Sequence, residues 1–186
     1  MEPDELFFTR GIWNGNTRFD LRKWVIKHEF DNDMKKFVTL VFPTKSGQSI
    51  TPQQLAKFHE QLDVISAAVE EAKKDKKFEA KFSLGQRLFF TVSSKPFFKC
   101  QFRKWYIPRA IYKSRLERCD MSNFESDLRP SEDGAVFGLW SFDKCKQIAL
   151  EAVEKFGLEK CQCEDPQICS FCSPFEWEVQ MAKRQI

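Results

Sequence analysis

The stretch LFFTRGIWNGNTRFDLRKW, from Leu6 to Trp24, has a second version further on, LFFTVSSKPFFKCQFRKW, from Leu88 to Trp105. The LFFT tetrads are offset by 82 positions and the RKW triplets by 81, so the spacing changes once between them. Self-similarity at a fixed offset is typical of a repeated structural unit. We therefore expect two copies of one unit in this chain.

The first copy has the pattern of strands followed by one helix. After LFFT, an Asn-Gly turn precedes a segment that alternates from Thr17, with Phe19, Leu21 and Val25 predicted on one face. KKFVTLVF, residues 35–42, is a further strand that we expect to stop at Pro43. Only MEPDE precedes LFFT, so the sequence offers no convincing earlier strand in this copy.

The helix of the first copy has clear start signals. Thr51 is the expected N-cap, Pro52 takes the first helical position, and Gln54 completes a capping box. Apolar residues then recur at spacings of three and four up to Ala72, which predicts one continuous amphipathic helix.

The second copy repeats this order. Strands are expected from KFEAKFSL, LFFTV and FFKCQFRKWYI, and the strand GAVFGLW follows an insertion at residues 108–133. Ser141 is the predicted cap of the last helix, and Gly157 its stop. We predict an α+β fold of two ββββα-type units, residues 1–77 and 78–158, forming a pseudodimer within one chain. A Cys-rich tail, residues 159–186, follows.

Composition and charge indicate which classes of protein and of ligand to expect. No apolar run approaches the roughly 20 residues of a membrane span, and acids stand where a signal peptide would carry positive charge. These features favour a soluble intracellular protein. Ten Lys or Arg against one acid lie between Lys81 and Arg118, and an acidic stretch follows at residues 119–133. Such a basic block suits a polyanion, although the same charges also serve to solvate a surface.

Several motifs resemble the C-terminal domain of transcriptional positive cofactor four, a coactivator that binds single-stranded DNA. The likeness lies in Asp20, Leu21 and Arg22, in the Gly47, Ser49, Ile50 and Pro52 pattern, and in FSLGQRLFFTV and QFRKWY of the second copy. It covers about residues 5–157. The resemblance implies four strands and a helix per unit, a β-surface that grips single strands, and a nuclear role in transcription or replication. Plant Whirly proteins carry two such units in one chain.

Binding of single strands requires cations for phosphates and aromatic faces for bases. Arg22 and Arg103 carry the family's arginine, Trp13 its hairpin aromatic, and Tyr106 the aromatic after the arginine motif, which Val25 replaces in the first copy. Alternation and charge add further candidates for phosphate contact: Arg10, Arg18, Arg87, Lys95, Lys99 and Arg109. Trp24 and Trp105 share the faces of the arginines but equally suit a core or a seam between the units.

The tail holds Cys161, Cys163, Cys169 and Cys172. The last two have the Cys-x-x-Cys spacing of a zinc knuckle, and four thiolates can close a tetrahedral site. Structural zinc, free or oxidisable thiols, and disulfides all remain open from the sequence; no other cofactor is indicated.

Neither histidine lies in a nucleophile or metal motif, and no Gly-rich phosphate loop is present in the sequence, so we expect no enzyme. The first interpretation is a protein that binds single-stranded DNA and works with the transcription machinery, as a monomeric pseudodimer or a higher assembly of it. RNA is an equally suitable ligand on stacking and phosphate contacts alone. The alternative is a protein-interaction module that keeps the fold but has lost nucleic-acid binding, because the acidic insertion could cover the ligand face.

Overall fold

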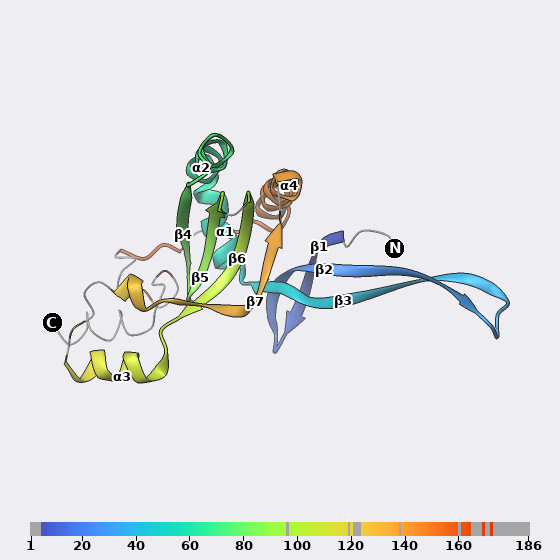
Figure 1. Ribbon diagram of the computed structural model, residues 1–186, viewed down its shortest axis with the longest axis horizontal. Helices are drawn as coiled ribbons and strands as arrows, with labels where there is room; N and C mark the ends of the chain where they lie inside the picture. The colour runs from blue at the N-terminus through green and yellow to red at the C-terminus, as the bar shows by residue number, and fades with distance from the viewer. Residues whose placement is uncertain are drawn as a thin grey trace.

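The computed structural model describes residues 5–95, 97–118, 120, 124–137, 139–159, 161–164, 169 and 172. They form two antiparallel sheets and four α-helices, which confirms the α+β class (Figure 1). The first sheet has the order β1-β2-β3, with strands Glu5–Trp13, Asn16–Asp31 and Lys36–Ile50. The second has the order β4-β5-β6-β7, with strands Glu79–Gly85, Leu88–Ser93, Lys99–Tyr106 and Arg129–Phe137. The helices are α1 (Pro52–Glu60), α2 (Leu62–Lys74), α3 (Arg109–Glu117) and α4 (Leu139–Phe156), with a 3-10 turn η1 at Phe124–Asp127.

The two hairpins that carry the repeated motifs have the same register. Phe7 lies opposite Arg22 in the β1–β2 pair, and Phe89 lies opposite Arg103 in the β5–β6 pair. The change in spacing falls in the turns. β1 and β2 are joined by the two residues Asn14 and Gly15, both with positive φ, whereas residues 94–98 join β5 and β6. The match supports a repeated unit, and the pseudodimer stays a prediction.

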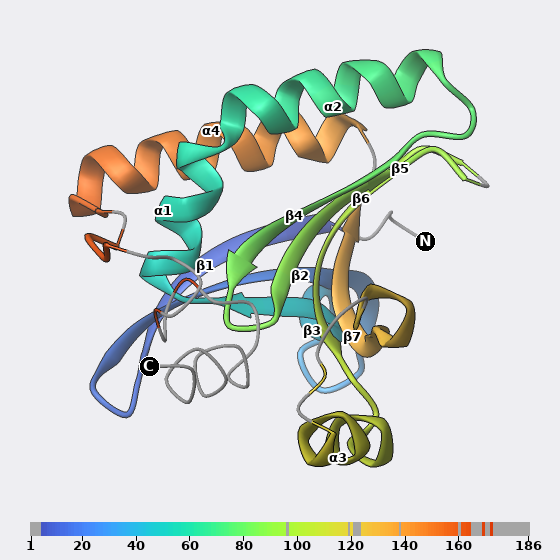
Figure 2. The same ribbon diagram turned by 90° about the vertical axis from the view of Figure 1, so that its left-hand side faces the viewer.

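One hydrophobic core joins the two copies, with helices α1, α2 and α4 on one side of the strands (Figure 2). Phe58 of α1 packs against Phe90 and Phe102 of the second sheet, with ring centroids 5.1 and 5.0 Å apart. Phe156 of α4 contacts Phe19 of the first sheet at 5.9 Å. Helices α1 and α4 therefore each contact the sheet of the other copy.

The predicted start of α1 is confirmed, but the single long helix is wrong. Thr51 accepts a hydrogen bond from the Gln54 backbone N–H, and the Gln54 side chain accepts one from the Thr51 N–H. The helical path breaks at Gln61, whose side-chain amide donates to Lys57 O and to Ser83 O of β4. This tie to the sheet explains the bend between α1 and α2. Within the described residues, no helix has both the length and the apolarity needed to cross a membrane.

Two further sequence predictions are corrected at element boundaries. β3 does not stop at Pro43 but runs through it, because Pro43 pairs with Trp24 beside a register shift where a missing N–H is tolerated. Ser141 is not the cap of α4, since that helix begins at Leu139, two positions after Phe137, the last residue of β7. The end of α4 at Phe156 confirms the predicted stop at Gly157, and Leu158 N donates to Val153 O.

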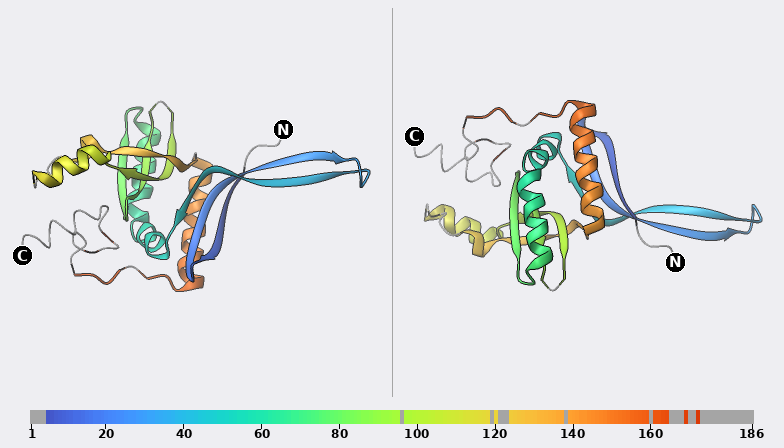
Figure 3. Two further views of the ribbon diagram at one scale, coloured as in Figure 1. Left: turned by 90° about the horizontal axis from the view of Figure 1, so that it is seen from below. Right: turned by 90° about the horizontal axis from the view of Figure 1, so that it is seen from above.

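The strands β2 and β3 continue beyond the body as a two-stranded ribbon, residues 25–42, which we call the arm (Figures 1 and 3). Val25 therefore lies in the arm opposite Phe42 and not, as predicted, on the core face with Phe19. The tip is a turn in which the Asp31 carboxylate accepts hydrogen bonds from the N–H groups of Asp33 and Met34, both at 2.9 Å.

Candidate functional site

The arginine of each repeated motif lies at an irregular point of its sheet. The register shifts between Arg22 and Trp24 in β2, and again between Arg103 and Trp105 in β6. Arg22 donates to the Asp20 carboxylate at 2.9 Å and to Thr44 O at 2.8 Å. Arg103 donates to the Gln101 side chain, and to the carbonyls of Ser131 and Glu132 on β7. Both guanidinium groups therefore hold a bulged strand against its neighbour.

A glycine lies directly opposite each arginine. A Cβ on Gly47 would come within 2.7 Å of Arg22 Cζ, and one on Gly134 within 2.8 Å of Arg103 Cζ. Each glycine follows a proline by four positions, and Pro43 and Pro130 pair with Trp24 and Trp105 in the same way. The repeated Pro-x-x-x-Gly spacing is a further likeness between the two halves of the sequence, which the sequence analysis missed.

The face of the second sheet that is turned away from the main core carries aromatic side chains, and the insertion packs against it. Phe89 and Leu128 are buried there, with Trp105, Tyr112 and Leu116 around them. Tyr112 and Leu116 belong to α3, and an ion pair from Arg115 to Asp127 at 2.5 Å ties α3 to η1. Lys81 Nζ lies 3.5 Å from the Trp105 ring centroid. Protein atoms therefore contact part of the surface on which bases were expected to stack.

Two arginines, one from each copy, lie near enough to Lys104 of the second sheet for their charges to act on it. Arg87 is in the β4–β5 turn. The residue after it, Leu88, pairs with Lys104 of β6. Burial lowers the pKa of half-buried Lys104, and the charges of Arg87 and of Arg18 on β2 lower it further. We call these three residues the basic cluster. Arg18 and Arg87 were predicted, whereas Lys104 was missed because its neighbours Arg103 and Trp105 carried the motif.

Gln86 and Arg87 both adopt positive φ, at 51° and 66°. Long side chains rarely take this conformation, and it costs about 1–3 kcal/mol per residue. The backbone of this turn is therefore strained, and the Arg87 side chain that it carries is exposed. Its position is fixed by a hydrogen bond from Trp105 N to Arg87 O at 2.9 Å.

The other predicted binding residues are spread over the molecule. Arg10 is exposed on β1, with Cζ 4.4 Å from the Phe156 ring centroid, and Trp13 pairs with Asn16 at the end of β1. Lys95 and Lys99 lie at the β5–β6 turn, at the opposite end of β5 from Arg87. Tyr106 ends β6 with 40% of its surface exposed, and Arg109 is the exposed first residue of α3. The structure thus brings Arg18 and Arg87 near Lys104, but not these six.

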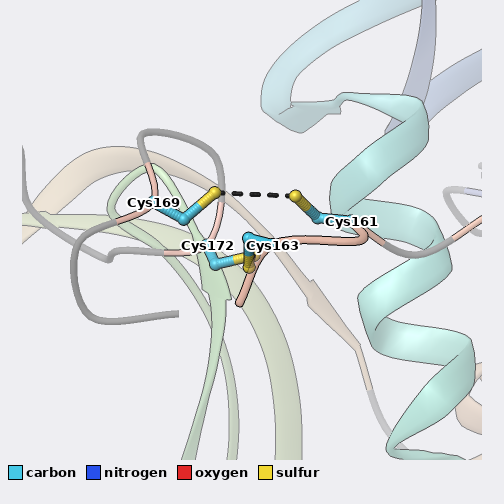
Figure 4. A group of neighbouring side chains, drawn as sticks. All are labelled: Cys161, Cys163, Cys169 and Cys172. Atoms are coloured by element: carbon cyan, nitrogen blue, oxygen red, sulfur yellow. Dashed lines mark hydrogen bonds between the residues drawn. The ribbon is translucent and has the colours of Figure 1, made fainter. Parts of the chain in front are cut away.

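The four tail cysteines form a compact group of sulfur atoms (Figure 4). Their Sγ atoms all lie within 4.8 Å of one another, and the pairs Cys161–Cys169 and Cys163–Cys172 are 3.5 Å apart. All four are free thiols. In a tetrahedral site, a metal–sulfur bond of about 2.3 Å places the sulfurs about 3.8 Å apart. The group is therefore close enough to bind a metal ion.

This cysteine group is anchored to the body. Lys57 Nζ on α1 donates to Cys172 O at 3.1 Å, and Cys172 is buried. Burial raises the pKa of the Cys172 thiol, and its hydrogen bond to the Cys163 sulfur is the next cause. When a metal ion binds to a group of neutral thiols, it displaces their protons and the sulfurs become thiolate ligands. Four cysteine sulfurs therefore suit a metal that prefers sulfur ligands. The sequence analysis had named these four residues as candidate metal ligands.

Comparison with protein-family models, curated proteins and solved structures gave no match to this chain.

Proposed function

We propose that this protein binds single-stranded nucleic acid and that the basic cluster contacts its phosphates. The observation that carries the proposal is the convergence of Arg18, Arg87 and Lys104 from both copies of the repeat. Bringing like charges together, one of them half-buried, costs free energy in the isolated protein. A bound phosphate would offset that repulsion, so the arrangement suits an anionic ligand better than it suits stability alone.

The resemblance to the positive cofactor four domain supports the same ligand class and extends it to a role in transcription or replication in the nucleus. In this proposal Arg22 and Arg103 act as positioning residues, because their guanidinium groups already bind carbonyls and side chains of neighbouring strands. Tyr106 is partly exposed at the end of β6, in the stretch that carries Lys104, and offers a face for base stacking.

A salt titration of binding tests the proposal. Fluorescence anisotropy with labelled single- and double-stranded DNA 20-mers, and an RNA 20-mer, gives log affinity against log salt for each ligand. We expect tighter binding of single strands, with a slope of about 0.7 per phosphate contact. The triple variant Arg18→Ala, Arg87→Gly and Lys104→Met should lower that slope by about 2. Glycine is used at position 87 because φ there is positive.

A matched control removes the same charge elsewhere. Lys74, the last residue of α2, and Lys76 and Lys77, which precede β4, are exposed at the end of β4 away from Arg87. Their triple alanine variant should keep the wild-type slope to within one contact. An equal fall in slope for both triple variants would mean that total charge, rather than the basic cluster, governs binding.

We further propose that the cysteine group holds one structural zinc ion. Cys161, Cys163, Cys169 and Cys172 supply the four soft ligands, and zinc would fix the tail against α1 through Cys172. The Lys57 ammonium partly offsets the negative charge that four thiolates bring to this ion. When bound, zinc contributes folding free energy of the tail rather than chemistry.

A protein-interaction module is the second candidate. It is favoured by the packing of α3 against Phe89 and Leu128, which covers part of the predicted stacking face. Under this alternative, neither single- nor double-stranded 20-mers bind at low salt, and removal of the basic cluster leaves the protein's behaviour toward nucleic acid unchanged.

A further inference from the structure

The arm is held to the rest of the described strands only through its base, since β1 stops pairing with β2 at Trp24. It is two strands wide, and no other described strand pairs with the outer edge of β2 beyond Trp24. An isolated two-stranded ribbon is marginally stable in water, and an open edge is a template for pairing with another strand. The arm nevertheless forms a regular ladder from Val25 opposite Phe42 to Asp31 opposite Lys36.

One face of the arm is apolar and exposed. Ile26 lies opposite Val41 and Phe30 opposite Phe37, and all four share a face with the hydrogen-bonded pair His28 and Thr39. Phe30 is 48% exposed and Phe37 is 74% exposed. Their rings meet edge to face at 5.3 Å but have no other described ring contact.

The charge of the arm argues against a polyanion as its partner. Residues 25–42 contain three lysines and three acids, so their formal charges cancel. A neutral ribbon with exposed phenylalanines suits a protein strand better than phosphates.

The arrangement of charges along β2 points to a second copy of the same chain. If two β2 edges pair antiparallel about a two-fold axis at His28, Lys27 of each copy lies opposite Glu29 of the other. The same register places Ile26 opposite Phe30, twice. Antiparallel strands are stabilised when residues of unlike charge face each other across the pair, and also when apolar residues do. The β3 edge, centred on Thr39, offers no such charge pair.

We propose that the arms of two copies pair edge to edge through β2, making a continuous four-stranded sheet that joins the two molecules. A two-fold interface uses the same patch on both subunits, which the self-complementary register at His28 satisfies. The pairing gives each Phe30 ring a neighbouring Ile26 side chain and satisfies backbone groups along both edges.

Charge reversal tests the register directly. Light scattering after size exclusion, at low salt and over a range of protein concentrations, should show a dimer for the wild type. Lys27→Glu and Glu29→Lys should each weaken dimerisation about tenfold or more, because two attractive pairs become repulsive. The double variant K27E/E29K should restore the dimer. An equimolar mixture of the two single variants should form a heterodimer, since positions 27 and 29 are then both acidic in one chain and both basic in the other.

Matched apolar variants complete the design. Phe30→Ser should weaken the dimer, whereas Phe97→Ser, at a residue that is 65% exposed in the β5–β6 turn, should not. Far-ultraviolet circular dichroism confirms that each variant is folded. A wild type that stays monomeric at every concentration overturns the proposal, as does a dimer that all three arm variants leave unchanged. A monomer that loses nucleic-acid affinity on Phe30→Ser would assign the arm to nucleic acid and also overturn it.

Discussion

Gly134 lies directly opposite Arg103, so close that a Cβ on the glycine would come within 2.8 Å of the guanidinium carbon. Gly47 stands in the same relation to Arg22. The arginine side chain therefore runs across a strand position at which only glycine leaves room. This pair of contacts fixes the bulged strand in both sheets.

We expect Gly134→Ala and Gly47→Ala to lower the free energy of unfolding by about 1–3 kcal/mol each, because an added methyl group must displace an arginine whose nitrogens are hydrogen-bonded. Urea denaturation followed by circular dichroism measures this change. Gly11→Ala is the control, since a Cβ there meets nothing within 4 Å. Equal effects at positions 11 and 134 would show that the close approach carries no energetic weight.

Local signals predicted much of the fold. The capping box at Thr51, the Asn-Gly turn and the stop at Gly157 depend on nearby residues alone, and the structure confirms them. The path of β3 through Pro43 was not predictable in this way, because it depends on a register shift against β2. The bend at Gln61 likewise depends on a hydrogen bond to Ser83, 22 positions away.

The candidate sites show the same difference between local signals, which the sequence reveals, and long-range contacts, which it does not. The cysteine group was predicted because its four ligands lie within twelve residues of one another in the sequence. The basic cluster was only partly predicted, since Arg18 and Lys104 are far apart in the sequence and only the folded chain brings their charges near each other. The sequence analysis expected the acidic insertion to cover the ligand face, whereas Tyr112 and Leu116, which pack against Phe89 and Leu128, come from its basic half.

Metal content is the second prediction. Protein purified without chelator should contain one zinc per chain by atomic absorption, and Cys169→Ser or Cys172→Ser should lose it, because three thiolates leave the tetrahedral site open. Cobalt substitution should give the visible spectrum of a tetrahedral thiolate site. Cys145→Ser is the matched control, because that buried cysteine lies in the main core and is not one of the four ligands. Metal retained by Cys169→Ser, or absent from the wild type, would remove zinc from the cysteine group.

Thiol reactivity is the third prediction, made on a Cys119→Ser background with six cysteines left of seven. Burial raises the pKa of the Cys100 thiol to about 12, and burial together with Cys100 raises the pKa of Cys145. At pH 8 a disulfide reagent should therefore modify no more than four thiols after chelator treatment, and all six only in denaturant. Rapid modification of more than four thiols in the folded protein would contradict the buried placement of these two.

The same two thiols give stability a pH dependence of known sign. Their folded pKa values lie above the ordinary value of 9.0, so the folded state binds more protons than the unfolded state between pH 9 and 12. Their contribution to stability is complete below pH 9 and is lost as the pH rises through the folded pKa. Cys100→Ala should flatten that fall in unfolding free energy above pH 9.

Lys104 provides the last prediction, because stability and binding should change in opposite directions. Burial and the charges of Arg87 and Arg18 hold its pKa below the ordinary value of 10.5, so its charged form disfavours folding at neutral pH. Lys104→Met should therefore raise the unfolding free energy at pH 7 while lowering affinity for single strands and reducing the salt slope by about 0.7. The gain in stability should shrink as the pH rises from the folded pKa to 10.5, where the wild-type lysine also becomes neutral. Lys99→Met, at the other end of β6, is the control and should leave the unfolding free energy unchanged.

If Lys104→Met destabilises the protein and leaves the slope of log affinity against log salt intact, Lys104 has a structural role and the basic cluster does not bind phosphate.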